Sequence, residues 1–326
     1  MTTIPEPIED GGLQSPRDSA LGDEVDSSTT TLDSAATDYR YQNGRWYYAD
    51  DDRSLYLFPN DETEQERLDL DNAVWKLTLG EKMFMAPIEQ PQKILDLGTG
   101  TGIWAIQVAD QHPGAVVTGV DISPIQPTLV PPNCKFEYFD YNLDWNFHPH
   151  DFIFCRLPPG GLRTPEALFQ KAFRQLQPGG WLEIHGVCLP TSDDETIPPD
   201  SALHGWINHM SEALERADRD PSLELGQKYE DILRRVRFDG IARIEYKVPQ
   251  NEWPKDGSLK ELGRYNLESV DMGIEAFSMR PFTEFLGWTP EEVKVSEALV
   301  RRELRNREIH AYWPRFVVYG QKPVAA

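Results

Sequence analysis

A glycine-rich turn between two apolar runs constrains the fold of this chain more than any other feature. The segment KILDLGTGTGIWAIQVADQHPGAVVTGVDIS, residues 93–123, passes from one apolar run through this turn and a helix pattern into a second apolar run. Strands of this kind, separated by helices, are typical of a parallel sheet covered on both faces. Ligands bind at the carboxyl ends of such strands, and a turn without side chains lets a ligand approach the backbone closely. The glycines of the turn are Gly98, Gly100 and Gly102.

The rest of the chain continues the alternation of strands and helices. The first two strands are expected at 93–98 and 116–122, with a helix that begins near Thr101 between them. The QPGG sequence after Leu176 is expected to end a later helix. Together these patterns predict an α/β fold with a mostly parallel sheet and helices on both faces. Further strands are expected at 135–139, 151–157, 181–187, 241–248 and 315–321, and further helices at 164–176, 201–217, 223–236 and within 258–308.

The amino-terminal part of the chain changes composition near residue 39. Residues 1–38 are rich in Ser, Thr, Asp, Glu, Pro and Gly, and cannot bury enough apolar surface to offset their ordering entropy. We therefore predict a disordered acidic tail over 1–38 and one folded domain over 39–323. The aromatic segments YRYQNGRWYY and SLYLFPND predict two short strands around an Asn-Gly turn, and helical spacing follows at 62–83.

The chain carries a formal net charge of −22 at pH 7. DNA-binding proteins take most of their affinity from Lys and Arg, so this charge argues against direct nucleic-acid binding, and it disfavours anionic membrane surfaces likewise. No apolar run approaches the roughly 20 residues of a membrane span, and the start of the chain lacks a secretion-signal pattern. Cys134, Cys155 and Cys188 form no CxxC pair. Neither a zinc site nor a disulfide framework is therefore expected. This use of cysteine predicts a reducing, intracellular compartment.

Two common nucleotide-binding patterns match the glycine turn poorly. A dinucleotide site reads G-x-G-x-x-G, and counted from Gly98 its third glycine position holds Ile103. A P-loop requires Gly-Lys-Ser/Thr after its turn, and no lysine lies between Lys93 and Lys135. The turn therefore favours a ligand that carries an amine, a ribose and an adenine but no phosphate.

One aspartate follows each of three successive predicted strands. Asp96 is placed to sit near an ammonium group, and Asp121 is placed to accept hydrogen bonds from both ribose hydroxyls, as acids at this position do in dinucleotide folds. Asp140 is placed to accept from the exocyclic amine of an adenine. Combined with the glycine turn, this pattern predicts S-adenosylmethionine as the cofactor.

Several segments spread along the chain resemble one known family. The sequences DLGTGTGIWAI and GVDISPIQP resemble the fungal LaeA-like methyltransferases, a branch of the seven-stranded class I methyltransferase fold. The resemblance covers roughly residues 39–323. It is also carried, in the family order, by YRYQNGRWYY, PNDETEQERLDL, APIEQPQKILDLGTGTGIWAI, VPPNCKFEYFDYNLDW, FRQLQPGGWLEI, WPKDGSLKELGRYN and REIHAYWPRFVVYGQKP.

The resemblance implies an S-adenosylmethionine-dependent enzyme or regulator of fungal secondary metabolism with a Rossmann-like seven-stranded sheet. Its cofactor-binding core would span about 88–190, and helices at about 62–86 and 252–308 would form a lid. In this family pattern Asp140 and Tyr141 would hold the adenine, and Arg156 would face the methionine end or the substrate. The cofactor residues that this implies are Asp96, Gly98, Thr99, Gly100, Gly102, Asp121, Ile122, Asp140, Tyr141 and Arg156.

The methyl acceptor is harder to predict, because two loops depart from the family pattern. These loops, RLPPGGLRTPEAL and EIHGVCLP, would border the acceptor site. In the first, Leu157 replaces the polar residue that amino- and base-methylating enzymes use, so nucleobase methylation is not expected. The predicted lid contains an aromatic stripe, which favours a hydrophobic or aromatic small molecule. Its members are Trp253, Tyr265, Phe277, Phe282, Phe285 and Trp288.

Methyl transfer from a sulfonium is an in-line displacement, so positioning and water exclusion are the enzyme's main contributions. A carboxylate acceptor needs no general base, whereas a phenol, enol or amine can need one. His185, just beyond the fifth strand, is the first candidate for a base, and a hydrogen-bonded structural histidine is the alternative. A structural role is favoured for His310. No metal site is expected, because His204 and His209 lie at i and i+5 of one helix.

Three functions remain open from the sequence. The first is a biosynthetic methyltransferase that acts on an oxygen, a nitrogen or a carboxyl group of a small molecule. The second is a nuclear regulator of secondary metabolism that works through protein partners, and the third is a cofactor-binding protein that has lost methyl transfer. The tail lacks a basic cluster that would serve as a nuclear import signal, which favours the enzyme and a cytoplasmic location over a nuclear one.

Overall fold

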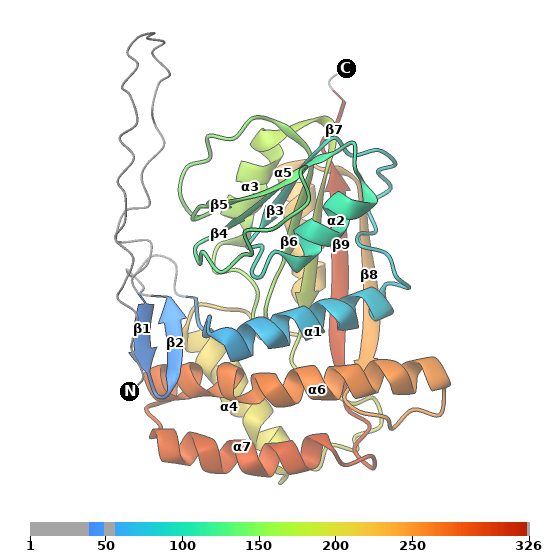
Figure 1. Cartoon of the computed structure of the whole chain (residues 1–326). Helices are drawn as coiled ribbons and strands as arrows, with labels where there is room; N and C mark the ends of the chain where they lie inside the picture. Colours follow the sequence, from blue (N-terminus) through green and yellow to red (C-terminus); the bar gives the residue numbers. More distant parts are fainter. Residues whose placement is uncertain (1–38, 49–55, 325–326) are drawn as a thin grey trace, which may run out of the picture. The chain divides into compact units, whose positions relative to one another are not determined.

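The computed structural model of the chain describes residues 39–48 and 56–324 (Figure 1). The predicted acidic tail, 1–38, lies outside the described residues. Seven of the strands form one sheet in the order β5-β4-β3-β6-β7-β9-β8. These strands are β3 (Lys93–Leu97), β4 (Val116–Asp121), β5 (Cys134–Tyr138), β6 (His150–Arg156), β7 (Leu176–Val187), β8 (Asp239–Pro249) and β9 (Tyr312–Gln321).

The sheet is parallel except at one side. Strand β3 pairs in parallel with both β4 and β6, and β7 continues the parallel part beside β6. Strand β9 lies antiparallel to both β7 and β8. The predicted α/β fold with a mostly parallel sheet is therefore confirmed. The start of β9 consequently lies at the same edge of the sheet as the carboxyl ends of β3, β4, β6 and β7.

Alternating side chains of the strands face two different helix layers. Ile94 of β3 packs in a cluster with α2 (Ile103–Gln111), whereas Leu95 packs in a cluster with α3 (Pro165–Gln175) and α5 (Leu225–Val236). This alternation follows from the period of two in a strand, and burial on both faces explains why the strands are nearly continuous apolar runs.

The remaining helices gather at the carboxyl edge of the sheet. Helix α1 (Glu62–Thr78) packs against α6 (Gly257–Arg280), and α6 in turn contacts α7 (Pro290–Leu304). Figure 1 shows α1 crossing below the sheet, with α6 and then α7 further from it. Helix α4 (Ala202–Arg216) contacts α7 and the short π-helix η2 (Pro281–Leu286). These helices hold a second large apolar cluster, to which Leu189 and Trp313 at the edge of the sheet also belong.

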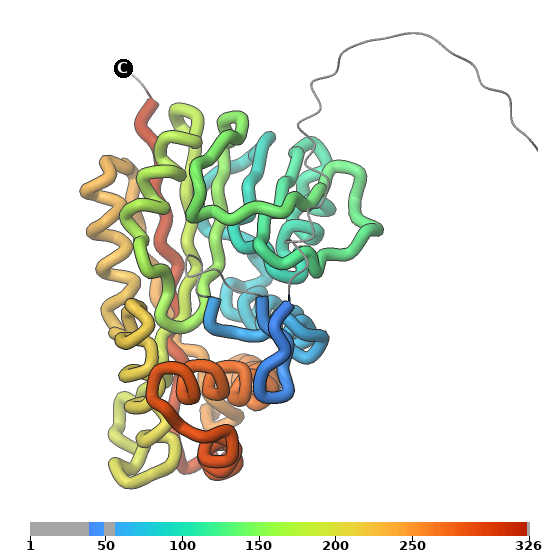
Figure 2. The backbone as a smooth tube through the Cα atoms, turned by 90° about the vertical axis from the view of Figure 1, so that its left-hand side faces the viewer, coloured from blue at the N-terminus to red at the C-terminus, as the bar shows by residue number. Residues whose placement is uncertain are grey.

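A two-stranded hairpin lies beside the start of α1. It consists of β1 (Tyr39–Gln42) and β2 (Arg45–Tyr48), joined by Asn43 and Gly44 with φ of 51° and 88°. Positive φ at both turn positions is what an Asn-Gly hairpin turn requires. Figure 2 shows the hairpin next to α1 and the α6–α7 layer, and ion pairs from Arg45 to Asp61 and Glu275 make that contact.

The structure corrects three expectations about element boundaries. Both hairpin strands lie within YRYQNGRWYY, and residues 56–61 of the second aromatic segment form no strand. Helix α1 ends at Thr78 rather than near 83. The QPGG sequence does end α3, but it already belongs to β7, because a register shift between β6 and β7 accommodates it. The helices expected within 258–308 are α6, η2 and α7, with Pro281 at the start of η2 and Gly287, at a left-handed φ of 75°, at its end.

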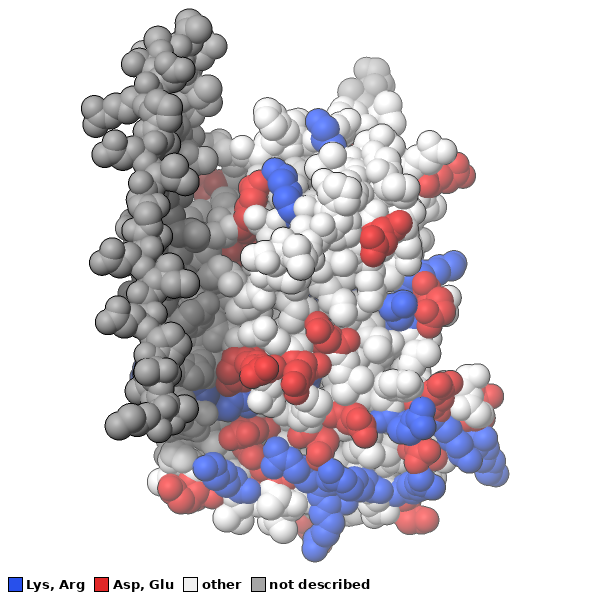
Figure 3. Space-filling model, in the orientation of Figure 1, with Lys and Arg blue, Asp and Glu red and all other residues white. Residues whose placement is uncertain are grey.

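The surface over α6 and α7 carries charges of both signs. Figure 3 shows acidic and basic side chains intermixed over this part of the face. Arg305 pairs with Asp271, and Arg307 pairs with Glu252. Exposed pairs of this kind contribute little to stability, typically about 0–1 kcal/mol each. Within the described residues, no helix is both long and apolar enough for a bilayer crossing.

Candidate cofactor and acceptor site

One cavity lies at the carboxyl edge of the sheet, beneath the lid helices α1 and α6. The turns after β3, β4, β5 and β6 form its wall on the side of the sheet. Side chains from α1, from α6 and from the start of β9 form the opposite wall. The lid helices were expected at about 62–86 and 252–308, and parts of both regions line the cavity. The structure therefore brings together four strand ends and two helices that are far apart in sequence.

The cavity collects nearly all the residues that the sequence assigned to a cofactor. Gly102 is the exception, because it lies outside the described lining of the cavity. An ideal Cβ at Gly102 would lie 2.3 Å from Cζ of Phe136, so this glycine makes room for a ring of β5 rather than for a ligand. The residues that do line the cavity are Asp96, Gly98, Thr99, Gly100, Asp121, Ile122, Asp140, Tyr141 and Arg156.

The turn after β3 is folded tightly around the carboxylate of Asp121. The backbone N–H of Gly100 donates to Asp121 Oδ2 at 2.8 Å, and the N–H of Ser123 donates to Oδ1 at 2.9 Å. Gly98 and Gly100 have φ of 70° and 58°, a region that glycine adopts without steric cost. Asp121 is thus fixed at the rim of a turn whose backbone is open to the cavity. A ribose with two adjacent hydroxyls fits this acceptor.

Asp96 is the deepest acid of the cavity. Its carboxylate accepts a 2.6 Å hydrogen bond from the hydroxyl of Thr99, and the side chain is buried. Burial raises the pKa of Asp96 to about 7, and it raises the pKa of Asp121 to about 6. A cation placed against either carboxylate would offset the cost of burying the charged form. The acids therefore suit a ligand with an ammonium and a ribose.

We expect the affinity for S-adenosylhomocysteine to rise with pH. In the folded protein without ligand, both pKa values lie above the ordinary 3.8 of an aspartate, so ionising these acids destabilises the fold as pH rises from about 4 to 7. The ligand's ammonium favours ionised Asp96, so the association constant should rise about tenfold between pH ~6 and ~7.5. Calorimetry across this range measures it. Asp96→Asn should flatten the profile, and an equally flat profile in the unmodified protein would contradict the placement.

Asp140 and Tyr141 lie on the far side of the glycine turn from the lid. The carboxylate of Asp140 accepts 2.8 Å hydrogen bonds from the backbone and side-chain N–H groups of Asn142. The Tyr141 ring approaches Gly98, with its Cε1 3.7 Å from an ideal Cβ there. A flat ring together with a carboxylate suits an adenine, so the adenine assignment remains a prediction with compatible geometry.

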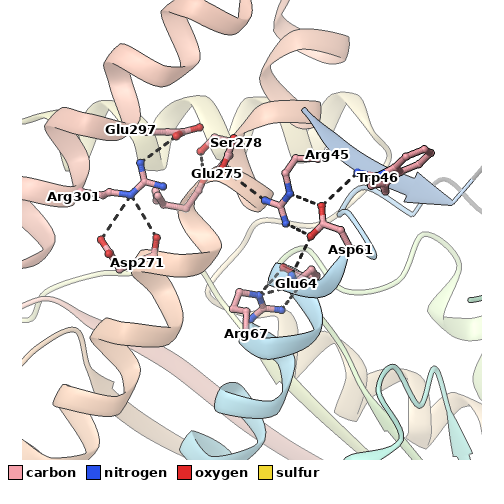
Figure 4. Close-up of polar contacts among 11 residues, drawn as sticks. Arg45, Trp46, Asp61, Glu64, Arg67, Asp271, Glu275, Ser278, Glu297 and Arg301 are labelled. Carbon is pink, nitrogen blue, oxygen red and sulfur yellow. Dashed lines mark hydrogen bonds and ion pairs between the residues drawn. The ribbon is translucent and has the colours of Figure 1, made fainter. Parts of the chain in front are cut away.

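A polar network joins the hairpin, the start of α1 and the lid (Figure 4). Asp61 caps α1 by accepting from the N–H of Glu64, and Arg45 of β2 binds both of its carboxylate oxygens at 2.5 and 2.6 Å. One turn along α1, Glu64 holds Arg67 in a buried ion pair, with the Arg67 guanidinium 5.1 Å from the ring centroid of Phe277. Because Arg67 and Phe277 line the cavity, this network fixes its outer wall.

Two arginines line the cavity at the end of β6 and near the start of β9. Arg156 ends β6 and donates to Oδ1 of Asn72 at 2.9 Å, and Arg315 at the start of β9 donates to Asp71 at 2.6 Å. Both guanidiniums lie over Trp75, at 5.3 and 4.8 Å from its ring. Arg156 was predicted from the family pattern. The sequence analysis missed Arg315 and the α1 side chains, because helical spacing gives no sign that the polar face of α1 points inward.

His185 lies outside the described lining of the cavity. It is fully buried, its Nε2 is 2.6 Å from Oε1 of Glu183, and Trp75 stacks on its ring at 4.6 Å. Burial lowers its pKa to about 4, which leaves the imidazole neutral at pH 7. A general base must reach the proton that it removes. The geometry therefore supports the structural alternative for His185 and not the catalytic one.

The buried carboxylate of Glu183 gives the histidine at position 185 a structural role. Its carboxylate accepts from the backbone N–H groups of Met85 and Ala86 as well as lying against His185. We expect His185→Ala to lower the free energy of unfolding by about 1–3 kcal/mol, since it leaves a gap under Trp75 and removes a partner of a buried charge. Chemical denaturation measures this. The pH profile of methyl transfer per folded molecule should not change, and a lost ionisation in that profile would restore His185 as a base.

The aromatic stripe that was predicted for the lid is mostly core. Phe282 and Trp288 pack around His209, and Trp253 stacks on His310 with ring centroids 4.8 Å apart. His310 also lies 2.6 Å from Asp194 through its Nδ1, in agreement with a structural role. Among the six aromatic residues named for the stripe, Phe277 is the one that the described cavity lining includes.

Fold and site together define a class of enzyme. The sheet has seven strands, of which β9, in the last position but one, is antiparallel to its neighbours, and a glycine turn follows β3. Carboxylates at the ends of β3 and β4 face the cavity beside that turn. The chain is an S-adenosylmethionine-dependent methyltransferase of the class I, Rossmann-like fold.

Comparison with known proteins narrows this class to a family. A family model described as a methyltransferase domain matches residues 73–234. Methyltransferase pytC of Aspergillus terreus is 40% identical over 92% of this chain and 93% of its own length. Secondary metabolism regulator LAE1 of Cochliobolus heterostrophus is 36% identical over 83% and 91%. Probable methyltransferase tdiE of Emericella nidulans is 36% identical over 80% and 83%. The chain belongs to the fungal LaeA-like family of S-adenosylmethionine-dependent methyltransferases.

Proposed function

We propose that this protein transfers a methyl group to an oxygen, a nitrogen or a carboxyl group of a small, largely apolar molecule of fungal secondary metabolism. The observation that carries the proposal is the continuity of the cavity. The same cavity that exposes the glycine turn and its acids extends to an apolar wall under the lid helices. That wall contains Leu157, Val187, Val270, Phe277 and Trp313. An apolar acceptor bound there would lie in the same enclosed space as the cofactor.

The chain's own residues act by binding and positioning. S-adenosylmethionine supplies a methyl group on a positively charged sulfur. Asp96 and Asp121 would hold its ammonium and ribose, and Ile122 with Tyr141 would enclose the adenine. Water exclusion by α1 and α6 favours a displacement between charged groups, because electrostatic interactions strengthen where water is absent.

The cavity offers little for proton abstraction. Neither a histidine nor a lysine is found among the described residues that line it. The carboxylates nearest the glycine turn are engaged by Thr99 or by backbone N–H groups. This composition favours acceptors that are already nucleophilic at neutral pH over those that need a strong base.

A regulatory role is the second candidate, because LAE1 of Cochliobolus heterostrophus is named a secondary metabolism regulator. Such a role would involve protein partners and a nuclear location, whereas the biosynthetic proposal keeps the cytoplasmic location as a prediction. Both roles use the same cofactor site. They differ in what the acceptor is.

Deleting the gene in the producing fungus separates the two candidates. The proposal expects one compound, or one small group of related compounds, to lose a methyl group, with accumulation of the unmethylated precursor. Mass spectrometry of culture extracts measures this. Silencing of many unrelated pathways would instead favour the regulator.

A further inference from the structure

Charges along the carboxyl edge of the sheet are sorted by sign. In the sheet order β5-β4-β3-β6-β7-β9, the residues that end the strands and line the cavity begin with three acids and finish with two arginines. Asp140 follows β5, Asp121 ends β4 and Asp96 lies near the end of β3, and the arginines lie at the end of β6 and near the start of β9. A cavity with this polarity suits a cationic ligand at one end and an anionic ligand at the other.

The two arginines have hydrogen-bond donors to spare. Their buried Nε atoms, and also Nη1 of Arg315, have no partner among the described residues. Arg315 is 3% exposed and lines the cavity. A buried donor without a partner costs about 1–3 kcal/mol, and more when charged, so such atoms at a cavity wall indicate a missing ligand.

The two guanidiniums differ in their partners from α1. Asp71 accepts a hydrogen bond from Arg315, whereas Arg156 donates to the neutral amide of Asn72. Arg67, another arginine of the cavity wall, already forms a buried ion pair with Glu64. Near Trp75, the carboxylates of Asp71 and Glu183 accompany Arg156 and Arg315, so it is the unpartnered N–H donors of the two arginines that an incoming anion would satisfy.

The cofactor can supply only one of the anions that this site would accept. Arg156 ends β6, directly beside β3 and Asp96, so it is placed for the carboxylate of the methionine part. Arg315 lies three strand positions from β3, because β6 and β7 separate them. At about 4.8 Å between neighbouring strands, the backbones of β3 and β9 are about 14 Å apart. Arg156 is therefore the better placed of the two arginines for an amino-acid group bound at Asp96, and Arg315 remains for a second anion.

We propose that Arg315 binds a carboxylate of the acceptor and that this carboxylate is the group that is methylated. The proposal rests on the proposed function. A carboxylate oxygen forms a bond to the methyl carbon, the bond between that carbon and sulfur breaks, and its electron pair stays on sulfur. The products are a methyl ester and S-adenosylhomocysteine, with no proton to remove. This chemistry matches a cavity whose described lining contains neither histidine nor lysine.

Asp71 and Asn266 are positioning residues for Arg315. Both accept from Nη2 of Arg315, at 2.6 and 3.4 Å, from α1 and α6 respectively. Trp75 lies against the flat face of the guanidinium. These contacts use Nη2 and leave Nε and Nη1 as donors for a ligand, and a guanidinium presents its donors in fixed directions from which a carboxylate can accept.

Binding measurements alone test whether Arg156, and not Arg315, binds the carboxylate of the cofactor. S-adenosylhomocysteine contains the amino-acid part and 5′-methylthioadenosine lacks it. Arg156→Gln should weaken the binding of S-adenosylhomocysteine by about 10- to 100-fold without weakening that of 5′-methylthioadenosine. Arg315→Gln should leave the affinities for both ligands within about threefold of those of the unmodified protein. Arg301→Gln removes a guanidinium of α7 outside the described cavity lining and serves as the control (Figure 4). Selective loss of S-adenosylhomocysteine binding in Arg315→Gln would overturn the assignment.

The chemistry is tested with an extract of the deletion strain, which contains the unmethylated acceptor. Purified protein and S-adenosylmethionine with a tritiated methyl group are added, and the extracted product is treated with mild alkali. A methyl ester releases volatile labelled methanol, whereas an ether or a methylamine does not. Labelled product that is stable to alkali would overturn the inference. The absence of any labelled small molecule would instead contradict the proposed function.

Variants of Arg315 complete this experiment. Arg315→Gln should lower the labelling rate at limiting extract by about 10- to 100-fold. Arg315→Lys keeps the charge without the fork, so it should raise the apparent KM more than it lowers kcat. The affinity for S-adenosylhomocysteine reports whether each variant is folded. Equal labelling rates for Arg315→Gln and Arg301→Gln would show that Arg315 does not bind the acceptor.

Discussion

Replacing Gly102 by alanine is expected to destabilise the protein by about 2–5 kcal/mol, combining a left-handed backbone with overpacking. Gly102 has a φ of 81° and is the residue that caps α2. The ring of Phe136 fills the space beside it, with Cζ 2.3 Å and Cε1 2.7 Å from an ideal Cβ. The same ring lies 2.7 Å from an ideal Cβ at Gly119. Phe136 is thus wedged between two glycines of neighbouring segments.

Two further variants separate the backbone cost from the steric cost. Gly44 has a φ of 88° with nothing within 4 Å of an ideal Cβ, so Gly44→Ala should cost only the backbone part of about 1–2 kcal/mol. Adding Phe136→Ala to Gly102→Ala should cost less than the sum of the two single changes, because the clash disappears. Denaturant unfolding measures all of these. If Gly102→Ala were no less stable than Gly44→Ala, the Phe136 ring would not be tightly packed against Gly102.

Replacing Asp121 by alanine is expected to weaken S-adenosylhomocysteine binding by about 10- to 100-fold, since a hydrogen bond to a charged group contributes about 1.5–3 kcal/mol. The change removes the acceptor for the ribose and also the acceptor that holds the N–H groups of Gly100 and Ser123. The glycine turn should therefore lose order as well as a ligand contact. Stability without ligand should fall less than affinity does, because the raised pKa shows that burying this acid is itself costly.

The matched control for Asp121 is Asp110, an exposed aspartate on α2. Asp110→Ala changes the net charge equally and should leave the affinity unchanged. Asp121→Asn keeps one oxygen acceptor, so its affinity for S-adenosylhomocysteine should lie between those of Asp121→Ala and Asp110→Ala. Isothermal titration calorimetry gives the affinities. If Asp121→Ala binds as tightly as Asp110→Ala, the ribose lies elsewhere.

The fold was predictable from the sequence because its strands are buried on both faces. Runs such as those at 93–98 and 151–157 are apolar at nearly every position, and only helices on both sides of a sheet explain that. The lid was less predictable. Helices α6 and α7 pack on other helices, and their aromatic residues are as apolar in a core as in a binding wall. Phe277 and Phe282 belong to the same apolar cluster, and only their position in the folded chain shows that Phe277 also lines the cavity.

The cofactor half of the site was predictable for a similar reason, and the acceptor half was not. Asp96 and Asp121 lie at the ends of recognisable strands, so their place at one edge of the sheet follows from topology. Arg315 precedes most of a strand that runs antiparallel to its neighbours, and no sequence pattern indicated that its start lies beside the end of β7. The sequence left both a base and a structural role open for His185, because it does not show the pairing with Glu183.

The division of the cavity into an acidic and a basic half links these observations. The acidic half is suited to the ammonium and the ribose of the cofactor, and the basic half is suited to anions. The lid helices contribute to both, since α1 supplies Asp71 and Asn72 to the arginines and Leu68 to the glycine turn. A movement of α1 would therefore alter both halves at once, so acceptor release and cofactor release are expected to be linked.

Calorimetric titration of the full chain with S-adenosylmethionine, and separately with S-adenosylhomocysteine, tests the central claim most directly. The account predicts that each ligand saturates one site per chain with micromolar affinity, and that each competes with the other. Binding of neither ligand to correctly folded protein would contradict it, because the glycine turn and its acids would then not form a cofactor site.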